Sequence, residues 1–448
     1  MDRPNWMDYS KGLIIEWRQA MLEGQDVADM QALCELISAH TDAEGYAPIA
    51  EAVLEKMAQA GTVPGYSFVE PSDYEGILAE LPPLRHALGS DSLSADVLKE
   101  KIKGAWLGRI SGCLLGKPIE GMMRAPIWAL LQKTGNFPLH KYINKQEFSP
   151  FESELRPQME DFWHRVWWAD MTEGMAPVDD DTNYTVMYMK LLETYGRAFT
   201  SENILDAWLT WMPILESSTA ERLTYRNAAM GLSIPEAALF HNPCREWVGA
   251  QIRGDIFGYV NPGKPRQAAE MSWRDARVSH IKNGIYGEMF VSAMIAAAFV
   301  TDNLMTIVEA GLDEIPKNCR LTKEIERIIG YYQSGTPVDD VIEQLHKDYN
   351  EEKCLDWCQT IPNAMIVTMA LLYGGGDFGK TICLAVQPAF DTDCNGATVG
   401  SIIGARNGAP GVSEYWIQPF HKGLQTSISG YQFVTVDLLT EKVLALCE

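Results

Sequence analysis

The sequence predicts an all-α protein in which many helices form one compact body. Apolar residues recur at helical spacing through most of the chain, whereas strand-like alternation is confined to residues 433–436. Two stretches also carry glycine at every fourth position, and residues four apart share one face of a helix. The expected helices lie in 10–60, 95–116, 182–197, 201–212, 219–232, 265–282, 284–300, 302–312, 321–335, 337–349, 354–374, 377–387 and 394–408.

The two glycine-spaced stretches are predicted to be helices that pack closely together. Their glycines are Gly104, Gly108, Gly112 and Gly116, and then Gly396, Gly400, Gly404 and Gly408. A glycine inside a helix costs roughly 1 kcal/mol relative to alanine, so four in register are expected where another backbone approaches. Membrane helix dimers share this spacing. That interpretation is disfavoured because charged residues such as Arg109 interrupt the first stretch, and no run approaches ~18 apolar residues.

The composition is typical of a globular protein and disfavours polyanionic partners. The 448 residues are 46% hydrophobic and 22% charged, with a net charge of −23. We expect neither nucleic acid nor a membrane surface as a partner, because both are bound through basic groups. The nine cysteines are scattered, without a C-x-x-C pair, and no apolar signal region opens the sequence. We therefore expect a cytoplasmic protein with buried thiols, organised as an N-terminal helical extension (1–94) and one all-α domain (95–448).

Two clusters of carboxylates stand at the starts of apolar helices. One is Asp391 and Asp393, and the other is the run from Asp179 to Asp181. An N-cap explains one aspartate, but not three in a row. Two like charges ~4 Å apart repel by roughly 4 kcal/mol at an effective dielectric near 20, so such clusters favour solvent or a cation. Together they predict an oxygen-rich site for a hard divalent ion, Mg²⁺ above all.

Four motifs in order resemble the ADP-ribosylglycohydrolase family, named for dinitrogenase reductase-activating glycohydrolase and its relatives. The resemblance covers roughly residues 100–410. The family's G-x-P-x-E is matched by residues 116–120, its T-D-D-T by 179–182 at three of four positions, and its D-x-D-[ST] by 391–394 except at the last. The stretch 261–280 is similar to the family's N-P-G…A-A…D-A…T-H run.

The resemblance implies an all-α fold of orthogonally packed helices and a hydrolase that cleaves N- or O-glycosidic bonds at C1″ of ADP-ribose with two Mg²⁺ ions. The implied metal ligands are Asp180, Asp181, Asp391 and Asp393, with Asp179 at the position of a ligating threonine. Glu120, Asp180 and Asp393 are the implied catalytic residues, and Asn183, Asn227, Gly263 and His280 the implied substrate-binding residues. From the residues alone, Glu120 can also be a surface acid after a proline turn, and His280 a structural histidine.

Three departures from the family pattern leave the substrate open. Cys394 replaces a hydroxyl ligand, so one metal site can be weaker, absent or shifted toward Mn²⁺. Cys113 stands where many members carry aspartate. Gly231 stands in the arginine position of a loop that holds phosphate in family members, and the loop here begins at Arg226.

Three functions remain in view at this point. The first is removal of ADP-ribose from a protein or small molecule, and the second is hydrolysis of a smaller N-riboside or nucleoside-like metabolite. The third is a metal-binding regulatory protein with a relic site.

Overall fold

The chain is all-α, as predicted. The computed structural model describes residues 9–40, 46–85, 88, 93–155, 167–352 and 356–447. Three short strands accompany the helices: β1 (Met175–Ala176) pairs in parallel with β2 (Gly423–Gln425), which pairs antiparallel with β3 (Phe433–Val434). The predicted strand is therefore real but two residues shorter, because the Thr435 side chain accepts from the Leu438 amide and caps the next helix, α23 (Val436–Leu446).

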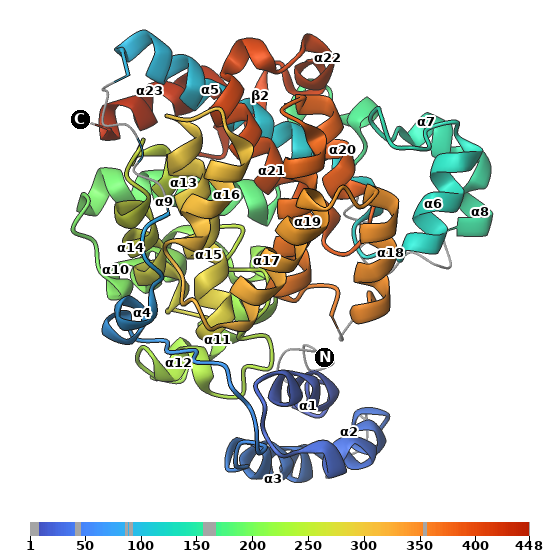
Figure 1. Ribbon diagram of the computed structural model, residues 1–448, viewed down its shortest axis with the longest axis vertical. Helices are drawn as coiled ribbons and strands as arrows, with labels where there is room; N and C mark the ends of the chain where they lie inside the picture. The colour runs from blue at the N-terminus through green and yellow to red at the C-terminus, as the bar shows by residue number, and fades with distance from the viewer. Residues whose placement is uncertain are drawn as a thin grey trace.

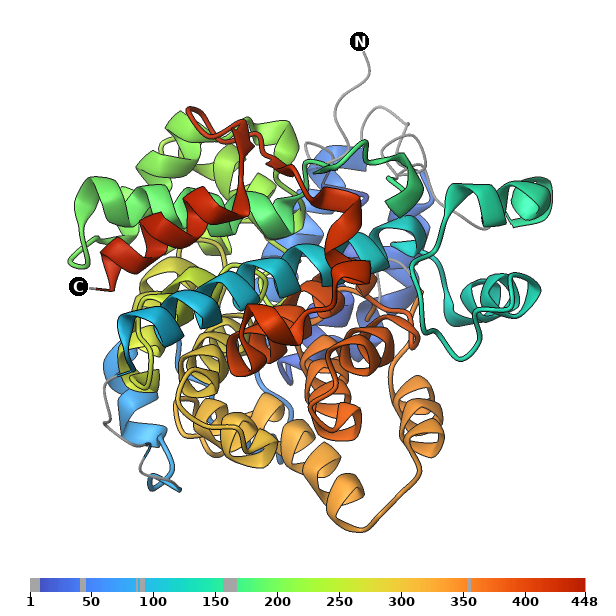
Figure 2. The same ribbon diagram turned by 90° about the horizontal axis from the view of Figure 1, so that it is seen from above.

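The centre of the molecule is the antiparallel pair of α5 (Ala95–Gly116) and α21 (Thr392–Asn407), the two glycine-spaced helices (Figures 1 and 2). A Cβ atom at Gly108 would collide with the carbonyl of Gly400, and one at Gly112 with the carbonyl of Gly396. The predicted close packing is confirmed. Gly408 caps the end of α21 with φ +71°, and its carbonyl carbon is among the atoms that a Cβ atom at Gly104 would meet.

Buried helices surround this pair. They are α9 (Asp180–Tyr195), α13 (Asp255–Tyr259), α14 (Pro265–Ala276), α15 (Lys282–Ala298), α19 (Thr360–Gly374) and α20 (Phe378–Val386). The helices farther out are α10 (Ser201–Trp211), α11 (Thr219–Ala229), α12 (Glu236–Leu239), α16 (Leu304–Leu312), α17 (Arg320–Gln333), α18 (Val338–Asp348) and α22 (Glu414–Ile417). A lobe of α6 (Arg124–Lys133), α7 (Lys145–Phe148) and α8 (Glu152–Leu155) projects to the right in Figures 1 and 2.

Most helix predictions hold to within a few residues, and two need correction. The helix expected over 265–282 ends at Ala276, and Lys282 already begins α15 after extended Ile281. The helix expected from 354 begins at Thr360, and residues 353–355 lie outside the described part.

The N-terminal helices α1 (Leu13–Leu22), α2 (Gln31–Ser38) and α3 (Tyr46–Ala58) have an apolar cluster of their own, formed by residues such as Leu13, Val53 and Met57. They lie at the bottom of Figure 1. In contrast, α4 (Tyr74–Glu80) places Ile77 in the main core.

A buried set of ion pairs docks the N-terminal helices on the main body. The Arg245 guanidinium lies 2.6 Å from Glu16 and 2.7 Å from Glu23, and Lys282 also contacts Glu23. Within the described residues, no helix combines the length and hydropathy needed to cross a bilayer.

A candidate metal centre where two helices begin

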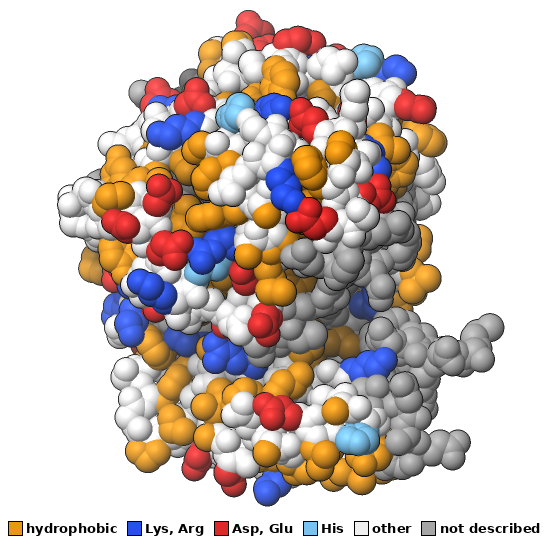
Figure 3. Space-filling view, turned by 90° about the vertical axis from the view of Figure 1, so that its right-hand side faces the viewer, with side chains coloured by type: hydrophobic (Ala, Val, Ile, Leu, Met, Phe, Trp, Pro, Cys, Tyr) orange, Lys and Arg blue, Asp and Glu red, His pale blue; other side chains and the backbone are white. Residues whose placement is uncertain are grey.

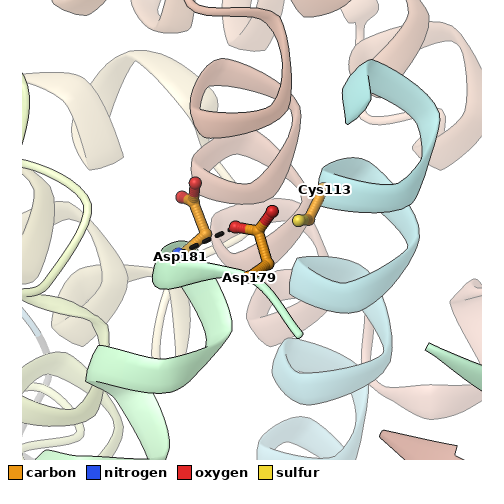
Figure 4. A group of neighbouring side chains, drawn as sticks. All are labelled: Cys113, Asp179 and Asp181. Carbon is orange, nitrogen blue, oxygen red and sulfur yellow. Dashed lines mark hydrogen bonds between the residues drawn. The ribbon is translucent and has the colours of Figure 1, made fainter. Parts of the chain in front are cut away.

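The acids at the N-termini of α9 and α21 lie close together. Asp179 is the N-cap of α9, and its side chain accepts from the Asp181 amide at 2.9 Å. Asp391 occupies the N-cap position of α21, and its backbone amide donates to the Asn363 side chain. Helix N-termini carry partial positive charge, which favours carboxylates there. Figure 4 shows Asp179 and Asp181 at the start of α9 beside Cys113 of α5.

The predicted acids lie close together although they are far apart in sequence. Ligand atoms of Glu120, Asp391 and Asp393 all lie within 4.8 Å of one another, and so do those of Asp181, Asp393 and Cys394. Asp393 therefore belongs to two potential cation sites. A third group of the same kind is Cys113, Asp179 and Asp181. Asp180, which follows Asp179, is half-buried.

Lys117 inserts its ammonium group among these carboxylates. Its Nζ lies 2.6 Å from Asp179 Oδ2, 2.9 Å from Glu120 Oε2 and 3.3 Å from Asp393 Oδ2. Burial alone would lower the pKa of this amine, but the surrounding acids outweigh it and hold the pKa well above its usual range. The ammonium is therefore charged. The sequence analysis missed Lys117 as a site residue, because it fills the unspecified position of the G-x-P-x-E motif.

A second positively charged side chain, that of Arg109, contacts the start of α9. It is fully buried in the middle of α5, lies 3.2 Å from Asp181 Oδ1 and donates to the Asp181 carbonyl at 2.6 Å. It also pairs with buried Asp255 at 2.9 Å. Arg109 was missed too, although an arginine inside a glycine-spaced helix is a signal of a buried ion pair.

Two thiols act as hydrogen-bond donors to the acids. Cys394 Sγ donates to Asp181 Oδ2 at 3.2 Å, and Cys358 Sγ donates to Asp391 Oδ2 at 3.0 Å. Burial and the adjacent carboxylates raise the pKa of both thiols well above the usual value. A protonated thiol is a poor metal ligand, so Cys394 contributes a hydrogen bond where a hydroxyl ligand was expected.

The acids fit a hard divalent cation. Burial and the neighbouring charge of Asp179 raise the pKa of Asp180 to about 8, and burial with Glu120 raises that of Asp393 well above its usual range. Asp393 is 1% exposed, and its Oδ1 has no hydrogen-bond partner among the described residues. An unpaired buried carboxylate oxygen is costly, and a cation would satisfy it. Carboxylate oxygens are the donors that Mg²⁺ prefers.

The four predicted substrate-binding residues lie in different surroundings. Asn183, in the first turn of α9, accepts from the Ser427 amide, and its buried Nδ2 has no hydrogen-bond partner in the part of the chain that the structure describes. Asn227 uses its Nδ2 on the carbonyls of Ala237 and Phe240, so it braces a loop.

The other two lie in the interior or in a turn. Gly263 has φ +70° and donates to the Ala296 carbonyl. His280 is fully buried with its Nδ1 2.7 Å from Ser279 Oγ, and burial and Arg253 lower its pKa well below the usual value. These placements leave Asn183 as the member that adjoins the acids.

A cleft of about 730 Å³ opens between the N-terminal helices and the main body (Figure 3). The acids of the cluster are not among its lining residues, but some of its wall residues lie near them in the chain or contact their neighbours. Met123 and Arg124 follow Glu120, and the ring of His346 lies 5.2 Å from that of Phe390, the residue before Asp391. Trp17 and Arg18 of α1 form the opposite wall, where Arg18 pairs with Asp356 at 2.8 Å.

Comparison with known proteins agrees with the motifs. The family model for ADP-ribosylglycohydrolase matches residues 94–446. No curated protein matches the chain. One solved structure that it resembles is described as an ADP-ribosylglycohydrolase-related protein complex, with 17% identity and a TM-score of 0.49 over 78% of this chain and 98% of that chain. Because the family model spans most of the sequence, the chain belongs to the ADP-ribosylglycohydrolase family.

Proposed function

We propose that this protein is a divalent-cation-dependent glycohydrolase that cleaves the C1″ bond of ADP-ribose attached to a protein or small molecule. The observation that carries the proposal is the convergence of Glu120, Asp391 and Asp393, whose ligand atoms lie within 4.8 Å of one another, with Asp393 Oδ1 buried and without a hydrogen-bond partner among the described residues. Family membership supports the glycohydrolase class.

We assign Asp180, Asp181, Asp391 and Asp393 as the cation ligands, and not Asp179, because it pairs with Lys117. Asp181, Asp391 and Asp393 each belong to a group whose ligand atoms lie within 4.8 Å of one another, and Asp180 precedes Asp181 in the chain. Mg²⁺ suits this set, and Mn²⁺ is the alternative. A bound cation supplies orientation of ribose hydroxyls and of water, together with charge stabilisation.

The chain's own acids have separate tasks in the reaction. Glycosidic cleavage passes through an electron-poor, oxocarbenium-like state at C1″, which nearby carboxylates stabilise. The Glu120 side chain is 19% exposed, so it is accessible to an approaching substrate and is suited to take a proton from the attacking water. With a cation bound, Asp180 and Asp393 would be ionised and would supply negative charge beside the transition state.

The division of the chain fits this function. We assign residues 95–448 to the catalytic domain and 1–94 to an extension whose helices α1 and α2 form one wall of the cleft. The opposite wall includes Met123 and Arg124, which closely follow Glu120 in the chain, so we assign the cleft to the part of the substrate that leaves or that extends beyond the ribose.

One observation favours a smaller N-riboside as the substrate. Arg226, near the end of α11 at the position of the phosphate-holding loop of family members, donates to the carbonyls of Phe240 and His241, and Asn227 donates to the carbonyls of Ala237 and Phe240. Gly231 offers no cation in their place. The side chains of Arg226 and Asn227 thus donate to backbone carbonyls of the protein, whereas a diphosphate site would use such donors for phosphate oxygens.

A hydrolysis screen followed by mass spectrometry tests both proposed substrate classes, ADP-ribosylated molecules and smaller N-ribosides. Wild-type protein is incubated with Mg²⁺ or EDTA and with ADP-ribosylated arginine and serine peptides, ADP-ribose derivatives and simple N-ribosides. Mg²⁺-dependent release of ADP-ribose supports the first function. Cleavage of phosphate-free ribosides alone supports the second, and cleavage of nothing in the panel contradicts both.

A further inference from the structure

The position of Lys117 is a consequence of the glycine contact between α5 and α21. A Cβ atom at Gly116 would collide with the backbone of Thr392 and the amide of Asp393, so the chain after α5 starts within reach of the acids. Lys117 opens a short 3₁₀ helix (Lys117–Ile119), and the Thr392 hydroxyl donates to the Gly116 carbonyl at 3.0 Å, which holds the two helix ends together.

The Lys117 ammonium touches acids from three different segments. Asp179 comes from the start of α9, Asp393 from the start of α21, and Glu120 from the turn after α5. Its Nζ donates to Glu120 Oε2 at 2.9 Å and to Asp393 Oδ2 at 3.3 Å, and it forms an ion pair with Asp179 Oδ2 at 2.6 Å. Its side chain is 14% exposed, which shows that it faces the acids and not solvent.

Asp393 belongs to two groups that could each hold a cation, one with Glu120 and Asp391 and the other with Asp181 and the Cys394 thiol. Lys117 uses two members of the first group, Glu120 and Asp393 Oδ2, and the Asp179 oxygen beside it. Left over are Asp393 Oδ1, which has no hydrogen-bond partner among the described residues, and the carboxylate of Asp391, which accepts from the Cys358 thiol.

We propose that the Lys117 ammonium takes the place of one of two divalent cations, so that each chain holds a single divalent ion beside a built-in positive charge. A divalent ion cannot share the position of an ammonium, because like charges at such distances repel strongly. Asp179 fits the same arrangement: it adds a carboxylate to the start of α9, and Lys117 neutralises it at 2.6 Å. The inference rests on the proposed cation dependence, but not on any particular substrate.

Lys117 is a positioning residue in this arrangement. Its bond to Glu120 holds that carboxylate against the acid cluster, a task that a second cation would otherwise perform. Its ammonium lies within 3.3 Å of three carboxylates, so it serves as a counter-charge in the cluster.

The test is a metal count on the full chain with Mn²⁺ alone. Wild-type protein is stripped with EDTA, dialysed against Mn²⁺, and measured by elemental analysis and electron paramagnetic resonance. We expect about one Mn²⁺ per chain and the hyperfine spectrum of an isolated ion. Lys117→Met, which keeps the stem and removes the charge, is expected to bind about two ions and to show the broadened spectrum of an interacting pair.

A matched control separates charge at the site from charge in general. Lys380→Met removes an exposed lysine of α20 and is expected to keep the wild-type count. Two ions in the wild type would overturn the inference and leave the cation-dependent function standing. No bound ion in the wild type would overturn both. The wild-type count decides the matter even if Lys117→Met does not fold.

Discussion

The carboxylates at the starts of α9 and α21 are arranged at the expense of stability. Asp181, Asp391 and Asp393 are each 4% exposed or less, and burial raises the pKa of all three. Groups that crowd like charges in a protein interior serve function more often than folding.

We therefore expect Asp391→Ala or Asp393→Ala to lower turnover by at least about 100-fold, because each removes an oxygen donor from the cation site. Helix content by circular dichroism is expected to remain that of the wild type, since neither side chain caps its helix by a hydrogen bond. A variant with normal turnover on a substrate that the wild type cleaves would show that the site is assigned to the wrong residues.

Sequence reasoning found these acids but not their partners. Asp391 and Asp393 are recognisable because two carboxylates precede a glycine-spaced helix. In the sequence, Arg109 is one charged residue inside an apolar helix, and Lys117 is a charged residue directly after the same helix. Arg109 contacts Asp181, 72 positions away, and Lys117 contacts Asp393, 276 positions away, and no local pattern encodes either contact. Cys358 was likewise hidden, since its bond to Asp391 exists only in the folded chain.

At the level of elements, the contact between α5 and α21 organises both the fold and the site. Gly108 and Gly112 each face a backbone carbonyl of α21, and this register places Gly116 against Thr392. The regular glycine spacing made this contact predictable from sequence. The lobe of α6 to α8 was not predicted as helical, because its helices are short and α6 carries Pro126 in its first turn.

Gly112→Ala is expected to destabilise the protein by about 3 kcal/mol or more, because the added methyl meets backbone that cannot rotate away. Thermal unfolding measures the effect. The matched control is Gly330→Ala in α17, where no neighbouring atom lies within 4 Å. There, alanine is expected to stabilise by roughly 0.5–1 kcal/mol through helix propensity. Equal effects at the two sites would contradict the close contact.

At the level of the whole molecule, buried ion pairs join the N-terminal helices to the main body. Burial by itself raises the pKa of Glu23, but the charges of Arg245 and Lys282 outweigh it and lower the pKa to about 2. A carboxyl whose pKa is lowered in the folded state stabilises above its unfolded value, and that contribution is lost as the pH falls through the folded value.

Stability of the wild type is therefore expected to fall between about pH 5 and pH 2 more steeply than that of Glu23→Gln. At pH 7 this variant should be less stable by roughly 2–3 kcal/mol, since the Arg245 charge stays buried with Glu16 alone. Denaturant unfolding at a series of pH values measures both effects. Glu55→Gln, at an exposed position of α3, is the control and should follow the wild type. Parallel curves for Glu23→Gln and wild type would contradict this docking.

The central claim is that the acids at the starts of α9 and α21 hold a cation that glycosidic hydrolysis requires. The most direct measurement is release of free ADP-ribose from an ADP-ribosylated peptide, followed by mass spectrometry in wild type and Asp393→Asn after EDTA and after Mg²⁺ is restored. We predict that wild-type release stops with EDTA and returns with Mg²⁺. In both conditions, release by Asp393→Asn is expected to be at least about 100-fold slower than release by the wild type with Mg²⁺. Release that persists in EDTA, or that Asp393→Asn retains, would contradict the claim.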